Sequence, residues 1–175
     1  MLLDRNAPGD GSRNATRMDW RKTLQERLPF FGHRNWIIVA DAAFPAYSQG
    51  GIETVIADQD LPTVVSHVAQ AIFSSKHVRA TVFLDQELEF VPEHNYPGIA
   101  RFRSEVTTLL ATTNLSSIPH SQVLSVIDDA GRTFRVLLIK TNTTIPYTSV
   151  YMRLDCGYLS DEIDDQIRNS IAAAE

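Results

Sequence analysis

The sequence predicts an α/β fold, a single three-layer α/β/α domain with a mostly parallel or mixed central sheet. The first observation is the alternation of short apolar runs with segments of helical period. The second is the unbroken apolar run at residues 36–40, which is typical of a strand covered on both faces. The third is size, because 175 residues with 43% hydrophobic side chains suffice for one core.

The first half of the chain predicts two helices and three strands. Asp19 suits an N-cap, and the helix that begins after Asp19 ends at Pro29. Asp60 and Pro62 precede the second helical pattern. In order, the predicted elements are a helix at residues 20–28, strands at 36–40 and 52–57, a helix at 64–73 and a strand at 78–84.

The second half predicts two more helices and three more strands. Residues 121–129 fit neither pattern clearly, and we interpret Gly131 as the punctuation after them. In order, the predicted elements are a helix at 97–111, strands at 115–118, 134–139 and 150–154, and a helix from Ser160. We expect one apolar stripe of this last helix to dock on its own domain or on a neighbour; it consists of Ile163, Ile167 and Ile171.

The pattern divides the chain into three parts. Residues 1–17 are expected to form a mobile arm, because Pro8, Gly9 and Gly11 break any regular pattern there. Residues 18–159 carry the alternating strands and helices of the domain. Residues 160–175 form a helical tail.

Composition excludes several classes of protein. A net charge of −5 and a pI near 5.5 lack the basic footprint that nucleic-acid binding needs. No apolar stretch near the start is long enough for a signal peptide or membrane span, so we expect a cytoplasmic protein without a membrane partner. Cys156 is the single cysteine, which excludes an internal disulfide and CxxC metal motifs. Asp85, Glu87 and His94 match no tight zinc or calcium spacing, so no metal site is predicted.

Polar residues at the ends of predicted strands are the candidates for function. Ligands of open α/β sheets bind beyond the carboxyl ends of the strands. Three stretches qualify: His33 and Asp41 flank the first strand, His120 follows the strand at 115–118, and residues 140–149 follow the strand at 134–139.

The order of these motifs resembles that of the ribose pyranase and fucose mutarotase family. Residues 32–45, GHRNWIIVADAAFP, are similar to its Gly-His, short apolar strand, Asp-Ala-Gly and proline, with the His-to-Asp spacing kept. Residues 118–120 resemble its Pro-His segment. Residues 139–149, IKTNTTIPYTS, are similar to its basic-Thr/Ser-Gly-Glu stretch that leads into Pro-Tyr-Ala/Ser-Asn. With further likeness at 83–87 and 93–95, the resemblance spans about residues 30–158.

The resemblance implies an isomerase that interconverts anomers or pyranose and furanose ring forms of a free monosaccharide, without a cofactor. Family members assemble as homo-oligomeric rings or decamers, with sites between subunits. Carried over residue by residue, His33 is the proton donor and Asp41 lies with it at the sugar as the second catalytic candidate. The implied substrate-binding residues are His120, Tyr147, Ser149 and Lys140.

These residue types suit the opening of a cyclic hemiacetal. The ring oxygen must gain a proton while the anomeric hydroxyl loses one, and an imidazole with an unperturbed pKa of about 6.5 can do either. Asp41 either takes the second proton or orients His33, and His120 is an alternative base. Tyr147 can donate to a hydroxyl and present its ring to the sugar.

Distance bears on this assignment. Eight extended residues would separate the backbones of His33 and Asp41 by about 26 Å, too far for one sugar to touch both. Either the chain bends before Trp36, or a second copy completes the pair. The second alternative agrees with interfacial sites, and the sequence therefore predicts a homo-oligomer.

Departures from the family pattern leave a second function open. Ser149 stands where the family has asparagine, and Ala43 replaces a glycine. Taken singly, His33 is an ordinary loop histidine and His120 a turn residue. The alternative is a non-catalytic module that binds monosaccharides or works with transport.

Overall fold

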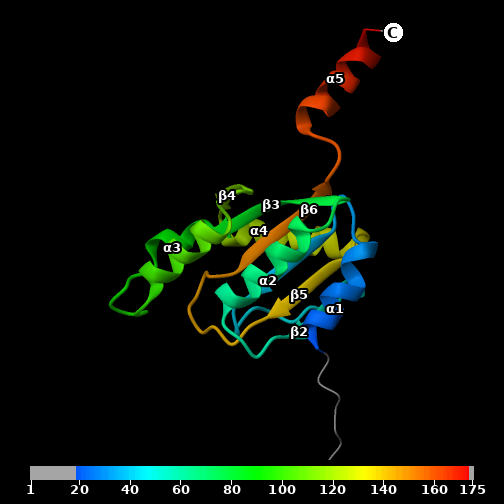
Figure 1. The fold of residues 1–175 in the computed structure, drawn as a ribbon. Helices are drawn as coiled ribbons and strands as arrows, with labels where there is room; N and C mark the ends of the chain where they lie inside the picture. The colour runs from blue at the N-terminus through cyan, green and yellow to red at the C-terminus, as the bar shows by residue number, and fades with distance from the viewer. Residues whose placement is uncertain (1–18, 174–175) are drawn as a thin grey trace, which may run out of the picture.

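The middle layer of the molecule is one six-stranded sheet in a computed structural model that describes residues 19–173 (Figure 1). Its strands are β1 (Trp36–Ala40), β2 (Ile52–Ile56), β3 (Val78–Asp85), β4 (Asn114–Ile118), β5 (Val136–Lys140) and β6 (Val150–Cys156). They lie in the order β2-β5-β1-β6-β3-β4. Strand β6 runs antiparallel to its neighbours β1 and β3, and the other described strands share one direction, so the predicted mixed sheet is confirmed.

Helices cover both faces of this sheet. Three of them, α1 (Trp20–Arg27), α2 (Leu61–Phe73) and α3 (Ile99–Leu109), pack on one face through a large apolar cluster. Helix α4 (His120–Thr133) packs on the other face through a second cluster, and Figure 1 shows it behind the sheet. The predicted three-layer α/β/α arrangement is therefore confirmed.

Side-chain alternation on the central strands explains the unbroken apolar run of β1. Ile37 and Val39 point into the cluster under α1 and α2, whereas Trp36, Ile38 and Ala40 point into the cluster under α4. All five are buried because both faces of the sheet are covered. Burial on both faces and pairing with β5 and β6 fix the positions of the polar residues at its two ends.

Short polar side chains begin three helices, as the sequence predicts. Asp19 accepts a hydrogen bond from the backbone N–H of Arg21 at the start of α1, and Asp60 accepts one from Thr63 at the start of α2. Ser160 accepts one from Ile163 in α5 (Asp161–Ala172). Each side chain satisfies one backbone donor that the first helical turn leaves without an intrahelical partner.

Helix α4 corrects one prediction. The segment left open at 121–129 is helical, and Gly131 lies buried inside the helix rather than ending it. A Cβ at Gly131 would meet the side chains of Gln49 and Ile52, and one at Gly51 would meet the carbonyl oxygen of Gly131. The glycine is there because α4 packs tightly against the start of β2, which a single-sequence pattern does not reveal.

Helix α5 extends away from the body of the molecule (Figure 1). No residue of this described helix is buried, and its isoleucines are about half exposed. The structure therefore does not dock the isoleucine stripe on its own domain. The predicted arm at residues 1–17 lies outside the described residues. Within residues 19–173, no helix has the length and apolar character needed to cross a membrane.

Candidate functional site

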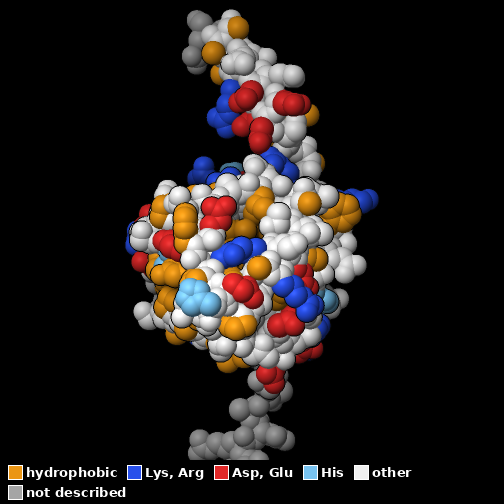
Figure 2. Space-filling model, turned by 90° about the vertical axis from the view of Figure 1, so that its left-hand side faces the viewer, with side chains coloured by type: hydrophobic (Ala, Val, Ile, Leu, Met, Phe, Trp, Pro, Cys, Tyr) orange, Lys and Arg blue, Asp and Glu red, His pale blue; other side chains and the backbone are white. Residues whose placement is uncertain are grey.

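Strand direction brings most of the candidate motifs to one edge of the sheet. Asp41 follows β1, Asp85 ends β3, and His120 follows β4 after one proline. Because β6 is antiparallel, Tyr147 and Ser149 reach the same edge just before β6 begins. The loop before β6 lies on the left-hand side of Figure 1, which is the side that faces the viewer in Figure 2.

A cavity of about 520 Å³ opens at this edge. Its volume falls in the range of roughly 300–1,000 Å³ that is typical of small-molecule sites. On this side of the molecule, histidine, acidic and hydrophobic side chains lie close together at the surface (Figure 2). The cavity is lined by Asp41, Ala42, Ala43, Phe44, Pro45, Tyr96, His120, Thr144, Ile145, Pro146 and Tyr147.

Asp41 is held in place by its neighbours. The Ser149 hydroxyl donates to Asp41 Oδ2 at 3.0 Å and accepts from the Asp41 backbone N–H at 3.2 Å. The backbone N–H of Ala43 donates to the other carboxylate oxygen at 3.0 Å. The carboxylate thus lies in the cavity wall with its orientation fixed from two sides.

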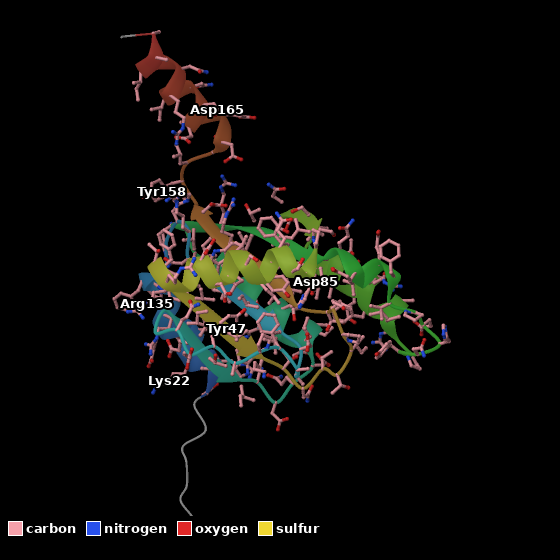
Figure 3. All side chains as sticks on the ribbon, turned by 180° about the vertical axis from the view of Figure 1, so that it is seen from behind. Lys22, Tyr47, Asp85, Arg135, Tyr158 and Asp165 are labelled. Carbon is pink, nitrogen blue, oxygen red and sulfur yellow. The ribbon has the colours of Figure 1, made fainter. Side chains whose placement is uncertain are left out.

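His120 is bound to a buried carboxylate. Its Nδ1 lies 3.0 Å from Asp85 Oδ1, and the Asp85 side chain is only 1% exposed. Tyr151 Oη donates to Asp85 Oδ2 at 3.3 Å from β6. Glu87, in the 3₁₀ helix Gln86–Phe90, accepts from the backbone N–H of His120 at 3.0 Å. Figure 3 labels Asp85 beside α4, whose first residue is His120.

Burial shifts the pKa values of two members of this group. Loss of solvent raises the pKa of Asp85, although the hydrogen bond and the charge of His120 and the hydrogen bond from Tyr151 oppose that rise. Burial also raises the pKa of Tyr151, and the nearby Asp85 carboxylate adds to the effect. Tyr151 therefore stays protonated and acts as a donor to Asp85.

Tyr147 packs against His120 across the cavity wall. The two rings meet edge to face with centroids 5.4 Å apart. The Tyr147 backbone has φ of 59°, a left-handed conformation that costs a non-glycine residue roughly 1–2 kcal/mol. Such a conformation persists where the surrounding structure enforces it, as at many functional sites. The residue is 38% exposed and lines the cavity.

His33 lies at the opposite edge of the sheet from this cavity. It precedes β1, and its Nδ1 lies 3.3 Å from Asp155 Oδ1 near the end of β6. Six residues of β6 separate Asp155 from Ser149, about 20 Å at the rise of an extended strand. The chain makes no bend in β1 that would bring His33 near Asp41. Within one chain, the two predicted catalytic residues are therefore apart.

Two of the predicted binding residues have other surroundings. Among residues 19–173, the cavity wall includes neither Ser149 nor Lys140. Ser149 is fully buried and positions Asp41 instead of facing a ligand. Lys140 ends β5 and is partly exposed outside the lining.

The sequence analysis missed two residues at this edge. Asp85 ends a strand as a polar residue, the same signal that marked Asp41, but beyond the likeness at 83–87 we weighed it only as a metal ligand. Tyr96 lines the cavity from the loop before α3, and nothing in the pattern distinguishes it from other loop aromatics. Across the described residues, no three His, Cys, Asp or Glu side chains form a group suited to a metal ion.

Comparisons with known proteins bear on the fold. No protein-family model matches the sequence, and no curated protein matches it. RbsD of Bacillus subtilis, solved in complex with D-ribose, is similar in structure with a TM-score of 0.58 and 16% identity, over 88% of this chain and 100% of RbsD. FucU of Bifidobacterium longum has a TM-score of 0.51 and 15% identity, over 77% of this chain and 92% of FucU. The chain therefore has the fold of RbsD and FucU, which confirms the predicted resemblance to the ribose pyranase and fucose mutarotase family at the level of the fold.

Proposed function

We propose that this chain is a cofactor-independent isomerase that interconverts anomers or ring forms of a free monosaccharide in the cavity beside β1. One observation carries the proposal. Asp41, His120 and Tyr147 come from three distant motifs, and all three line the same cavity. The complex of RbsD with D-ribose makes a pentose the first ligand to test.

The three side chains divide the work of opening the ring. His120 accepts the proton of the anomeric hydroxyl, the bond between the anomeric carbon and the ring oxygen breaks, and a carbonyl forms. The ring oxygen takes a proton from an acid on its other side. Asp41 accepts hydrogen bonds from sugar hydroxyls, and Tyr147 donates one. Reclosure on either carbonyl face gives the other anomer, and attack by a different hydroxyl gives the other ring size.

Magnetisation-transfer NMR on equilibrating sugars tests this function. With D-ribose, L-fucose and a small panel of other monosaccharides, the protein should accelerate exchange between anomers or ring forms of at least one sugar. Binding without faster exchange would instead identify the non-catalytic sugar-binding module. Neither binding nor exchange for any sugar would refute the proposed function.

Asp41→Asn is the variant that ties exchange to this cavity. The amide keeps the size of the side chain but removes the negative charge that strengthens hydrogen bonds from sugar hydroxyls. Catalysed exchange should therefore fall at least tenfold. Asp129→Asn is the matched control, because Asp129 is 70% exposed on α4, pairs with Arg132 at the surface and does not line the cavity. Equal loss in both variants would contradict a role of the cavity.

We further propose that His33 of a second copy supplies the acid for the ring oxygen. His33 is 59% exposed at the far edge of its own sheet, so its ring is accessible to a neighbour. A site completed by a second copy resolves the separation of His33 from Asp41 within one chain. The protein should then be an oligomer at working concentration, which light scattering measures.

Mixing two inactive variants tests the shared site. His33→Ala removes the proposed acid, and His120→Asn removes Nε2 while leaving an amide donor near Asp85. In mixed oligomers, roughly a quarter of the sites receive an intact His33 and an intact His120 from different copies, so exchange activity should reappear. If a demonstrably mixed oligomer recovers no activity, either each site takes both histidines from the same chain or His33 does not act in the site.

A further inference from the structure

Residues 19–173 hold two histidine–carboxylate pairs of different character. His33 is 59% exposed, whereas its partner Asp155 is only 9% exposed and is shared with Thr81 and Arg153. The His120 pair is more enclosed, because His120 is 29% exposed and Asp85 only 1%. Of the two, only the His120 pair lies at the cavity.

Both oxygens of Asp85 have a polar partner. Oδ2 takes a hydrogen bond from the Tyr151 hydroxyl, which burial keeps protonated. Oδ1 lies 3.0 Å from His120 Nδ1. A carboxylate can only accept hydrogen bonds, so the second contact is satisfied when His120 carries its proton on Nδ1. A neutral imidazole with that proton has an unprotonated Nε2 on the opposite side of the ring.

We infer that Asp85 is a positioning residue that holds neutral His120 in the Nδ1–H tautomer and so presents an unprotonated Nε2 to the cavity. The inference rests on the proposed function, since it makes His120 the base for the anomeric proton rather than a group that only binds sugar. Nothing in the family resemblance assigns Asp85 this role.

The surroundings of His120 restrict its ring. The Tyr147 and His120 rings pack edge to face, and Glu87 accepts a hydrogen bond from the His120 backbone N–H. Its side chain is 29% exposed and lines the cavity. The His120 ring thus lies between the buried Asp85 carboxylate and the cavity. This arrangement fixes the ring orientation and tautomer that a general base requires.

Charged and titratable groups from every adjoining element belong to the same environment. They are Asp41 after β1, Asp85 of β3, Glu87 of the 3₁₀ helix, Tyr147 of the preceding loop and Tyr151 of β6. Of these, Asp85 is the one in hydrogen-bond contact with the His120 ring. Replacing it should change the tautomer, whereas replacing Glu87 should not.

Nitrogen-15 NMR of the histidine rings provides the test. The chain has five histidines, and His120→Asn assigns the signal of His120. At a pH where the ring is neutral, wild-type protein should show His120 with its proton on Nδ1. Asp85→Asn should shift the population toward Nε2–H and reduce kcat for sugar exchange about a hundredfold, with KM changed little. Glu87→Gln should leave the tautomer as in wild type.

The outcomes separate the inference from the proposed function. A wild-type His120 with its proton on Nε2, or a tautomer unchanged in Asp85→Asn, would overturn the inference whether or not any sugar is turned over. The wild-type measurement needs no folded variant, so a destabilised Asp85→Asn does not weaken the test. Absence of catalysed exchange in wild type, with the Nδ1–H tautomer present, would refute the proposed function but leave the Asp85 contact as inferred.

Discussion

Ser149 and Asp41 form two mutual hydrogen bonds at the margin of the cavity. Removing the hydroxyl in Ser149→Ala leaves a buried backbone donor and one carboxylate oxygen without this partner. The free energy of unfolding should fall by about 1–3 kcal/mol, and KM for the sugar should rise as Asp41 loosens. Urea denaturation and exchange kinetics measure the two effects. Ser125→Ala, on the exposed face of α4, is the control, and an equal effect of both changes would contradict the pairing.

Asp85 gives stability a dependence on pH. Because its pKa is raised on folding, the folded state binds the proton more tightly than the unfolded state. The stability that protonated Asp85 gives the folded state is fully present below the ordinary pKa of 3.8. It is lost as pH rises through the raised pKa of the folded state. The free energy of unfolding of Asp85→Asn relative to wild type should therefore increase from about pH 4 upward. Urea denaturation from pH 4 to 8 measures this, and a decrease with rising pH would contradict the sign.

Individual residues were predictable where a motif and a strand end coincide. Asp41, His120 and Tyr147 were singled out by motif, and all three line the cavity. Asp85 was not predicted, because its contact with His120 depends on the pairing of β3 with β4. In that pairing Asp85 lies opposite Ile118, which is two residues before His120. Pairing between strands is a tertiary property that residue spacing does not determine.

At the scale of elements, α4 depends on the absence of a side chain at Gly131. In an ordinary helix, Gly→Ala would stabilise by about 1 kcal/mol. Here the added methyl meets Ile52 and Gln49, so overpacking of about 1–3 kcal/mol should exceed that gain. Thermal or urea unfolding of Gly131→Ala measures the net loss. Gly50→Ala, where a Cβ meets nothing, is the control, and a stabilised Gly131→Ala would contradict the packing.

Helix α5 contributes little to the body of the molecule. Its residues are unburied in the described chain, so truncation after Tyr158 should change the free energy of unfolding by less than about 0.5 kcal/mol. In Figure 3, Asp165 on this helix stands well away from the sheet, with Tyr158 at its base. Urea denaturation measures the effect. A loss above about 2 kcal/mol at low protein concentration would show that α5 docks on its own domain in solution.

The sequence predicted most elements because their signals are local. N-caps at Asp19, Asp60 and Ser160 and apolar runs of strand length need no knowledge of neighbours. Helix α4 was missed because a glycine such as Gly131 usually interrupts a helical pattern. The close contact of Gly131 with the start of β2 explains why a glycine lies inside this helix. Local signals thus located most elements, whereas helix α4 depends on tertiary packing.

For the whole molecule, the antiparallel direction of β6 is the decisive feature. It brings Tyr147 and Ser149 to the edge that the parallel strands β1 and β3 reach with Asp41 and Asp85. The sequence left the sheet as mostly parallel or mixed, and it left open whether the chain bends between His33 and Asp41. The extended, buried β1 places those two residues at opposite edges, so within one chain they do not meet at one sugar.

A crystal structure of the assembled protein with a bound monosaccharide tests the central claim most directly. The sugar should lie in the cavity, with its hydroxyls within hydrogen-bond distance of the Asp41 carboxylate and the Tyr147 hydroxyl and its anomeric oxygen near His120 Nε2. His33 of a second copy should approach the ring oxygen from the other side. A sugar bound elsewhere, with this cavity empty or covered by a neighbouring chain, would contradict the proposed site.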